Sequence, residues 1–299
     1  MSMSTAGIRP DVEVGVVIPA FNRGDCIGRA IASVQAQTMT NWEVIVVDDG
    51  STDDTVHVVR AIAERDPRIR LVIQPKNRGA QVARNRGIAA SAAKWVAFLD
   101  SDDRWHPTSL ELRLGLARER RASVVHSACD IQHEDGSTTP YRTAAQAGEI
   151  YESLLLSEGP MFQSMLVRRE ALDKIGGLDE RIVAFQEWDT ALSLARHFEF
   201  GYVTESTFVW DCRRGDTMSK NFVRAGRGYE QVFQKRFVDI LRTAGPSAIA
   251  EHYRRAAKWY RDADARGDAA RCTRWAGVWT ALDLRSAARR VRDRLAGHA

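Results

Sequence analysis

Residues 95–103 read WVAFLDSDD, an unbroken apolar run followed by three carboxylates within four residues. The apolar run is typical of a strand buried on both faces of a parallel sheet. Carboxylates at the end of such a strand are costly unless a cationic group lies among them. Open α/β sheets bind ligands at this end, and hard divalent cations take oxygen ligands that they share with phosphates. We therefore predict that Asp100 and Asp102 hold a metal ion and a nucleotide diphosphate; the competing interpretation is an N-cap for a helix over 107–118.

Short strands and helices alternate ahead of this stretch. The expected strands cover residues 12–19, 42–47, 69–73 and 95–99, and the expected helices cover 26–37, 52–64 and 80–91. This alternation predicts a parallel sheet with right-handed crossovers, an α/β fold. After Arg121 the pattern becomes α+β, with expected strands at 123–131, 163–167, 200–203 and 208–212, and helices at 170–175 and 187–197. From Gly226 onward only helical spacing is left, with a turn expected at residues 266–268.

The bulk composition excludes several classes of protein. Of the 299 residues, 44% are hydrophobic, as in ordinary globular proteins. No apolar run approaches the roughly 18 residues that span a bilayer, and residues 1–10 lack a hydrophobic signal core, so we expect a cytoplasmic protein. The four cysteines form no CxxC pair, which argues against a zinc site or a disulfide framework.

Charge is unevenly distributed along the chain. Residues 225–299 carry 16 Lys and Arg against 8 Asp and Glu, whereas residues 1–224 carry 27 against 31. This difference predicts a separate, basic C-terminal module.

Three loops of the predicted sheet carry polar residues where their strands end. Asp48 and Asp49 follow the second strand, residues 100–103 follow the fourth, and residues 19–22 follow the first. In one crevice, carboxylates could accept a uracil N–H, bind ribose hydroxyls and hold a metal on the phosphates. Gly79 and Arg84, at the start of a helix, would add a backbone N–H and a cation for the same phosphates.

Each of these features also has a purely structural interpretation. Residues 48–51 can be a turn with a helix cap, and Arg84 can lie on a solvated helix face. Their conjunction favours a ligand site more than any one of them does.

A candidate general base lies much further along the chain. Glu187 and Asp189 begin a helix, so either can be a cap, or either can remove a proton from an acceptor hydroxyl that attacks a sugar C1. Trp188 between them could stack on an acceptor sugar, although tryptophan is more often a core residue.

Over about residues 14–219, the chain resembles the family 2 inverting glycosyltransferases, which have a GT-A fold. The matching segments are VVIPAFN at 16–22, WEVIVVDDGSTDDT at 42–55, NRGAQVARNRGIAAS at 77–91, WVAFLDSDDRWHP at 95–107, IGGLDE at 175–180 and QEWDTALSLARHFEFGYV at 186–203. The resemblance implies a nucleotide-sugar donor, typically UDP-linked, a Mn²⁺ or Mg²⁺ ion, and inversion at the anomeric carbon.

The resemblance also implies roles for single residues. The residues that would line the base pocket are Pro19, Ala20, Asn22, Asp49 and, as an alternative to Asp49, Asp48. Asp100 would lie near the ribose, and Ser101 would line the same site. Asp102 would bind the metal and form the DxD motif with Asp100. Glu187 occupies the position of the catalytic carboxylate, with Asp189 as the alternative.

Two departures from the family pattern affect these expectations. The family often has Glu-Asp where this chain has Gln186-Glu187. Many members also have a histidine near the end of the catalytic region, whereas residues 210–219 contain none. We expect Arg213 or Arg214 to meet the diphosphate there.

The expected organisation follows from the segments and the resemblance together. It consists of a disordered N-terminus (1–11), a nucleotide-sugar-binding half (12–122), an acceptor and catalytic half (123–224) and a C-terminal helical region (225–299). The basic helices can pack on the catalytic body, pair in a homodimer, or contact anionic lipid beside a lipid-linked acceptor at the inner membrane face. No nucleic-acid motif is present.

The predicted function is sugar transfer to an acceptor hydroxyl in polysaccharide, glycolipid or other glycoconjugate synthesis. The alternative is a catalytically inactive protein that binds nucleotide-sugars as a scaffold. A nucleotidyltransferase would need a Gly-rich basic loop after the first strand, and a dinucleotide oxidoreductase would need GxGxxG there; residues 20–24 (AFNRG) provide neither.

Overall fold

The computed structural model describes residues 11–143, 147–212 and 221–296, with the side chains of the last helix described as far as Asp283. The chain divides into two compact units. Unit 1 comprises residues 1–151, 159–180 and 190–215, and unit 2 comprises residues 152–158, 181–189 and 216–299.

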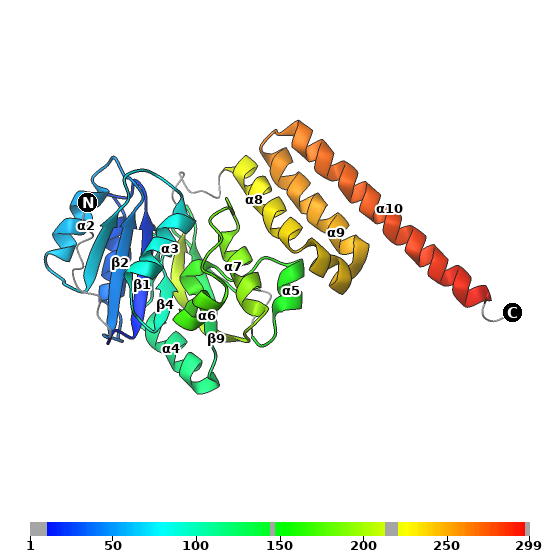
Figure 1. Ribbon diagram of the computed structural model, residues 1–299. Coiled ribbons are helices and arrows are strands. Elements are labelled where there is room, and N and C mark those ends of the chain that lie inside the picture. The colour runs from blue at the N-terminus through cyan, green and yellow to red at the C-terminus, as the bar shows by residue number, and fades with distance from the viewer. Residues whose placement is uncertain (1–10, 144–146, 213–220, 297–299) are drawn as a thin grey trace. The chain divides into compact units, whose positions relative to one another are not determined.

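The centre of unit 1 is a parallel sheet (Figure 1). Its strands are β1 (Val14–Ala20), β2 (Trp42–Asp48), β3 (Ile69–Ile73) and β4 (Trp95–Phe98). They lie in the order β3-β2-β1-β4 and pair in parallel, as the alternation of strands and helices predicted. Every residue of β2 and β4 is buried, which explains why these strands read as continuous apolar runs rather than as alternating ones.

Three helices connect these strands: α1 (Ile27–Gln35), α2 (Thr55–Ala63) and α3 (Ala80–Ala90). The apolar face of α1 is buried. Helix α3 packs unusually close to β1, because a Cβ added at Gly87 would lie 2.4 Å from Cγ1 of Val17. Only glycine therefore fits at this contact without a shift of the helix or the strand.

The rest of the sheet is mixed. Strand β8 (Leu166–Arg168) pairs antiparallel with β4, and β6 (Val124–Gln132) lies between β8 and β9 (Phe200–Asp211). The short strands β5 (Arg104–Trp105) and β7 (Thr138–Tyr141) pair with β9 and β6. Two strands were expected at 200–203 and 208–212, but β9 is continuous: its exposed residues 204 and 205 adjoin register shifts against β6.

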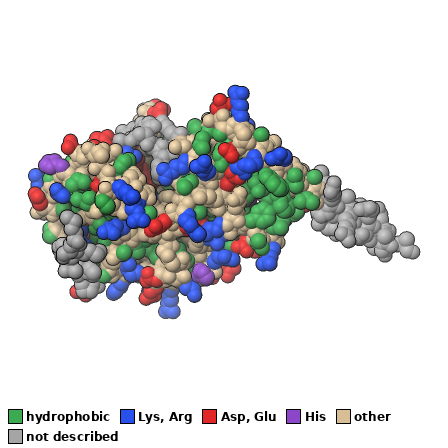
Figure 2. Space-filling model, turned by 45° about the horizontal axis from the view of Figure 1, so that its top comes forward, with side chains coloured by type: hydrophobic (Ala, Val, Ile, Leu, Met, Phe, Trp, Pro, Cys, Tyr) green, Lys and Arg blue, Asp and Glu red, His purple; other side chains and the backbone are tan. Residues whose placement is uncertain are grey.

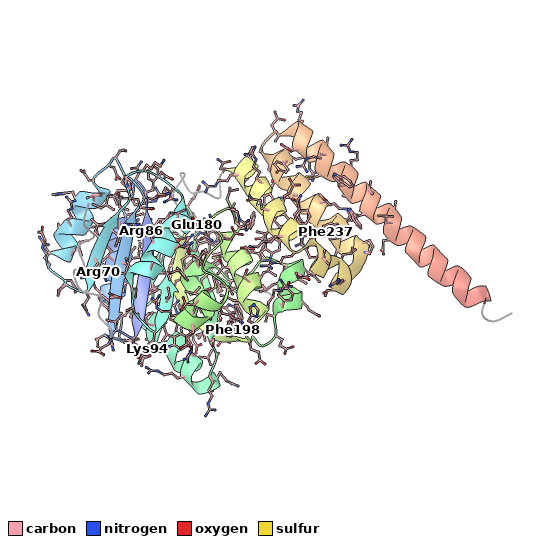
Figure 3. The ribbon with its side chains drawn as sticks, viewed as in Figure 1. Arg70, Arg86, Lys94, Glu180, Phe198 and Phe237 are labelled. Atoms are coloured by element: carbon pink, nitrogen blue, oxygen red, sulfur yellow. The ribbon has the colours of Figure 1, made fainter. Side chains whose placement is uncertain are left out.

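Helix α4 (Ser109–Arg120) follows β5, and a 3₁₀ turn, η1 (Phe162–Ser164), precedes β8. The strand expected at 163–167 therefore begins only at Leu166. Helix α6 (Arg169–Lys174), expected at 170–175, ends before Gly176 and Gly177, which both have positive φ. Asn85 of α3 holds the chain just beyond this turn through two bonds to the backbone of Leu178 and one to Glu180 (labelled in Figure 3).

Unit 2 is helical. It contains most of α5 (Tyr151–Leu156), the first turn of α7 (Gln186–Ala195), α8 (Phe222–Lys235), α9 (Phe237–Asp262) and α10 (Arg266–Ala296). One stripe of α9 is buried, and it comprises Ile249, Tyr253, Ala256, Ala257 and Tyr260. Gly245 interrupts α9 at φ 76°, directly before Pro246, which begins the next helical turn.

One expectation for these helices is wrong. The turn expected at residues 266–268 lies earlier, at Asp264 with φ 52°, because α10 already begins at Arg266. Apolar residues at helical spacing on α10 are exposed: Trp275, Val278 and Leu282 are 44%, 42% and 41% exposed. Figure 2 shows hydrophobic side chains gathered on this part of the C-terminal helices.

Candidate active site

The loops that follow β1, β2 and β4 meet at one edge of the sheet in unit 1. Ala20, the last residue of β1, pairs with Asp48, the last residue of β2. The Asp49 N–H donates to Ala20 O at 2.8 Å, and the Leu99 N–H donates to Val17 O at 3.1 Å. The predicted convergence of these loops is confirmed.

Asn22 joins the first loop to the second. It adopts φ 52°, a left-handed conformation that asparagine tolerates better than most residues. Its Oδ1 accepts from the Thr52 N–H at 2.9 Å, and its own N–H donates to Ser51 Oγ at 2.9 Å. Pro19 is half-buried and Ala20 is buried beside it.

Asp49 organises the loop before α3. Its Oδ1 accepts from Gln74 Nε2 and from the Arg78 N–H, both at 2.8 Å, and its Oδ2 accepts from the Gly79 N–H at 2.7 Å. The Gly79 N–H was expected to bind phosphate, but it is already bonded to this carboxylate. Gly79 instead matters for its φ of 97°, which lets the chain turn into α3.

Asp48 is buried next to Asp49 but is held differently. Its Oδ2 accepts from the Ser51 N–H at 3.2 Å, whereas its Oδ1 has no hydrogen-bond partner among the described residues. An unpaired buried acceptor is unusual, and it marks a position that a water or a ligand donor would satisfy.

Asp100 is held by donors on both carboxylate oxygens. Arg84 Nη2 donates to Oδ1 at 2.7 Å, and Gln163 Nε2 donates to Oδ2 at 2.8 Å. Arg84 is only 4% exposed, and its guanidinium lies 4.2 Å from the centre of the Phe162 ring. The interpretation of Arg84 as a solvated surface residue is therefore wrong.

Asp103 is the most deeply buried carboxylate of this loop. Its Oδ1 accepts from the Asp211 N–H at 2.9 Å, and its Oδ2 accepts from Gln163 Nε2 at 2.5 Å. Burial, reinforced by the negative charges of Asp100 and Asp102, raises its pKa well above the usual range.

The helix-cap interpretation of residues 100–103 is wrong. Strand β5 separates these residues from α4, and the N-cap of α4 is Thr108. These carboxylates therefore do not cap α4.

The donor set of this loop fits a hard cation. Asp102 is half-buried, Ser101 is buried, and the nearby ligand atoms are oxygens. Within the described residues, no three His, Cys, Asp or Glu side chains form a ready-made metal site. An ion at Asp102 and Asp100 would thus complete its shell with water and phosphate oxygens, as Mg²⁺ commonly does.

Gln74 and Gln163 also belong to this site, although sequence reasoning did not identify them. Each donates to an acidic residue from a segment outside the three loops. The only hint in the sequence is a polar residue within a largely apolar segment, which is too common a pattern to indicate a site.

The candidate base residues lie in unit 2, at the start of α7. Glu187 is half-buried. Asp189 is 2% exposed, and it forms ion pairs with Lys235 at 2.8 Å and with Arg236 at 3.6 Å. Two ion pairs to a side chain this buried fit a structural role for Asp189.

Trp188 does not offer a sugar platform in this structure. The side chain is 1% exposed, its Nε1 donates to Leu154 O at 2.7 Å, and its ring lies 5.1 Å from that of Tyr229. The core interpretation of Trp188 is correct, and the expected stacking on an acceptor is not. Arg213 and Arg214, expected near the diphosphate, lie outside the described residues.

Curated relatives match less than half of this chain at about 40% identity. The putative teichuronic acid biosynthesis glycosyltransferase TuaG of Bacillus subtilis is 37% identical over 124 residues, which are 42% of this chain and 49% of TuaG. The succinoglycan biosynthesis protein ExoO of Rhizobium meliloti is 42% identical over 124 residues, 42% of this chain and 35% of ExoO. The chain thus matches half or less of the length of these relatives.

Solved structures show the same fold over most of the chain. S. aureus TarS 1-349 in complex with UDP-GlcNAc has a TM-score of 0.63 at 15% identity, covering 88% of this chain and 90% of that one. The mannosyltransferase PcManGT from Pyrobaculum calidifontis, in complex with GDP-Man and Mn²⁺, has a TM-score of 0.61 at 18% identity, covering 95% and 82%. The predicted GT-A type of α/β fold is therefore confirmed.

The family model named glycosyl transferase family 2 matches residues 15–176, more than half of the chain. This range contains β2, β3, β4, all of β1 but its first residue, and the acidic loop after β4. The chain belongs to glycosyl transferase family 2.

Proposed function

We propose that this protein transfers a sugar from a nucleotide-sugar, most simply a UDP-sugar, to an acceptor hydroxyl with inversion. The observation that carries the proposal is the meeting of three polar loops at one end of the parallel strands. There Asp48 and Asp49 lie at the end of β2, and the Arg84–Asp100 pair lies at the end of β4. Together these residues provide hydrogen-bond acceptors for a nucleobase and a ribose, and charged groups for a diphosphate.

The nucleobase of the donor would be recognised by the two carboxylates at the end of β2, those of Asp48 and Asp49. Asp48 Oδ1 has an open acceptor position among the described residues, and Asp49 Oδ2 accepts a bond from Gly79 where a carboxylate oxygen can take two. A uracil imide N–H is a donor of the required kind. Pro19, Ala20 and Asn22 would form the neighbouring wall of the pocket.

Asp102, with Asp100, would hold Mn²⁺ or Mg²⁺, which when bound would neutralise charge on the departing diphosphate. Arg84, held between Asp100 and the Phe162 ring, supplies a fixed positive charge in the same region. Because its side chain is buried, this charge is weakly screened by solvent.

Glu187 would act as the general base. Its carboxylate would take the proton of the acceptor hydroxyl while the hydroxyl oxygen bonds to the anomeric carbon and the bond from that carbon to the diphosphate breaks. Attack from the face opposite the leaving group inverts the anomeric configuration. The relatives TuaG and ExoO, named for teichuronic acid and succinoglycan biosynthesis, favour a polysaccharide acceptor.

A donor panel tests this function. Release of nucleoside diphosphate from several nucleotide-sugars is measured with and without Mn²⁺. We expect one donor class to be used, Asp102→Asn to weaken donor binding, and Glu187→Gln to bind donor but lose at least about 100-fold in turnover.

Asp189→Asn serves as the matched control at the second carboxylate of α7. It should lower stability through its lost ion pairs but keep turnover per folded molecule. Normal turnover by Glu187→Gln together with loss in Asp189→Asn would reverse the assignment of the base.

We also propose that the C-terminal helices contact an anionic lipid surface. Trp275, Val278 and Leu282 are exposed on one side of α10, and Phe237 (labelled in Figure 3) packs its ring 5.3 Å from that of Trp279. Residues 225–299 carry a charge balance of +8 from 16 basic and 8 acidic residues. Exposed apolar side chains among cations are the pattern of a helix that lies in a membrane interface.

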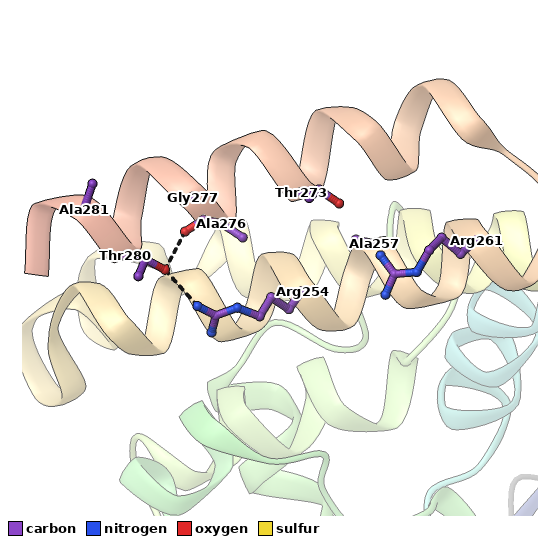
Figure 4. A pocket seen from close by; sticks show the side chains of 8 residues that line it. All are labelled: Arg254, Ala257, Arg261, Thr273, Ala276, Gly277, Thr280 and Ala281. Carbon is purple, nitrogen blue, oxygen red and sulfur yellow. Dashed lines mark hydrogen bonds between the residues drawn. The ribbon is translucent and has the colours of Figure 1, made fainter.

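A hollow of about 520 Å³ between α9 and α10 adds to this basic surface. Arg254 and Arg261 line it from α9, and small residues of α10 line the other side (Figure 4). Arg254 donates to Thr280 Oγ1 at 2.8 Å. Phosphate headgroups are suitable partners for arginines presented in this way. In the described part of the chain no helix has the length and apolarity of a membrane span, so the proposed contact is peripheral.

Co-sedimentation with vesicles tests the lipid contact. We expect binding to vesicles that contain phosphatidylglycerol, loss of binding at high salt, and weaker binding by Leu282→Ser. Ile73→Ser is the matched control, because Ile73 is 44% exposed on β3 of unit 1. Equal binding to neutral and anionic vesicles would contradict the proposal.

A further inference from the structure

Gln163 in the turn η1 contacts the acidic loop through its side chain. The residue is 6% exposed. Its Nε2 donates to Asp100 Oδ2 at 2.8 Å and to Asp103 Oδ2 at 2.5 Å. A primary amide has two N–H donors, so both are used to bridge two carboxylates that would otherwise repel each other.

The backbone of Gln163 is fixed from the other side. Its carbonyl accepts from Trp105 Nε1 at 3.0 Å and from Arg113 Nη1 at 3.1 Å. Arg113 is completely buried, and burial lowers its pKa to about 9. Arg113 also donates to oxygens of Ser109 and Met165, so it anchors the turn to α4.

The orientation of the Asp100 carboxylate is thereby fixed by a donor on each of its oxygens. Arg84 holds Oδ1 and Gln163 holds Oδ2, and neither donor is on the loop that carries Asp100. Loss of the amide would remove one of these two restraints on Asp100. Rotation of the carboxylate would also break its ion pair with Arg84.

We infer that Gln163 is a positioning residue of the donor site, which fixes Asp100 and, through it, Arg84 in the orientation that receives a nucleoside diphosphate. This inference rests on the proposed function. It assigns a role in ligand affinity to a residue that lies 60 positions beyond Asp103 and outside every polar motif of the sequence. The interaction acts through Asp100, so Gln163 itself is not catalytic.

A purely structural role makes a different prediction. If Gln163 only stabilises the fold, its replacement lowers stability without a separate change in ligand affinity. Gln37 provides the matched control, because it is 5% exposed and its side chain bonds to backbone groups of Ser33, His106 and Leu110 rather than to carboxylates.

The experiment compares Gln163→Met with Gln37→Met in the full chain. UDP binding in saturating Mn²⁺ is measured by calorimetry, and melting temperature is measured on the same samples. Both variants should melt earlier. The Kd for UDP should rise about tenfold or more in Gln163→Met, from loss of a bond to a charged group, and less than about twofold in Gln37→Met.

Two further variants make the test specific. Gln163→Asn keeps the amide on a shorter chain, and it should bind UDP with intermediate affinity; it also serves if Gln163→Met does not fold. In an Asp100→Asn background, Gln163→Met should add little further loss, because both changes act through the same carboxylate.

The outcomes separate the inference from the function on which it rests. If the unaltered protein does not bind UDP with Mn²⁺, the proposed donor is wrong. If it binds but Gln163→Met binds equally well, or if the losses of Asp100→Asn and Gln163→Met are additive, the positioning role is wrong.

Discussion

His252 is a buried histidine of unit 2 that should make the stability of the protein depend on pH. Its Nε2 lies 2.8 Å from Leu155 O and must donate, so Nδ1 accepts from Tyr229 Oη at 2.9 Å. Burial lowers its pKa to about 4, from an ordinary value of 6.5. The imidazole is therefore neutral in the folded protein and takes up a proton on unfolding wherever the pH lies between these values.

The sign of the resulting pH dependence follows directly. Between pH 6.5 and 4 the unfolded chain binds more protons than the folded one, so the free energy of unfolding falls as the pH is lowered. The full contribution of His252 is about 3 kcal/mol. Urea unfolding should show that His252→Gln, which keeps a donor and an acceptor, loses less stability between about pH 7 and pH 5 than the unaltered protein. An equal loss would contradict this assignment.

Residue identities in the site were only partly predictable from the sequence. Asp48, Asp49, Asp100 and Asp102 were predictable because each follows an apolar strand at a shared edge of the sheet. Gln163 was not, because its contact with Asp100 is made through the folded chain and no local pattern encodes it. The sequence also did not decide whether Trp188 is buried, because a tryptophan between two acidic residues can lie in a core or on a surface.

At the scale of elements, the approach of α3 to β1 gives a sharp prediction. A Cβ at position 87 would lie 2.4 Å from one methyl carbon of Val17 and 3.1 Å from the other. Gly87→Ala should therefore lower stability by about 1–3 kcal/mol despite the better helix propensity of alanine. In α4, a Cβ at Gly115 would meet nothing within 4 Å in the described part of the chain, so Gly115→Ala should be neutral or stabilising.

Thermal unfolding of the two alanine variants is the measurement. If the melting temperature of Gly87→Ala equals or exceeds that of the unaltered protein, α3 can move away from β1 without a loss of stability, and the prediction is wrong. Because α3 carries Arg84, this variant should also weaken UDP binding if the helix shifts.

Elements were predicted best where one physical pattern dominated. The apolar runs that form β2 and β4 are buried on both faces, and such short continuous runs are typical of strands in a parallel sheet. Strand β9 was predicted as two pieces because residues 204–206 are polar, and only pairing with β6 carries the strand across them. Strands β5 and β7 were missed, because short strands depend on their partners more than on their own residues.

For the molecule as a whole, the uneven charge along the chain assigns the two proposed contacts, with donor and with lipid, to different parts of the sequence. Unit 1 holds the carboxylates of the donor site, and the basic residues concentrate in the helices of unit 2. The proposed donor and lipid contacts should therefore respond independently to substitution. Leu282→Ser should leave UDP affinity unchanged, and Asp102→Asn should leave vesicle binding unchanged.

The central claim is that the acidic loop after β4 and the loops after β1 and β2 form one site for a nucleoside diphosphate and a divalent cation. Calorimetric titration of UDP, with and without Mn²⁺, tests it most directly. We expect Mn²⁺ to strengthen UDP binding to the unaltered protein and Asp102→Asn to abolish this increase. Absence of UDP binding in Mn²⁺, or an equal Mn²⁺ effect in Asp102→Asn, would contradict it.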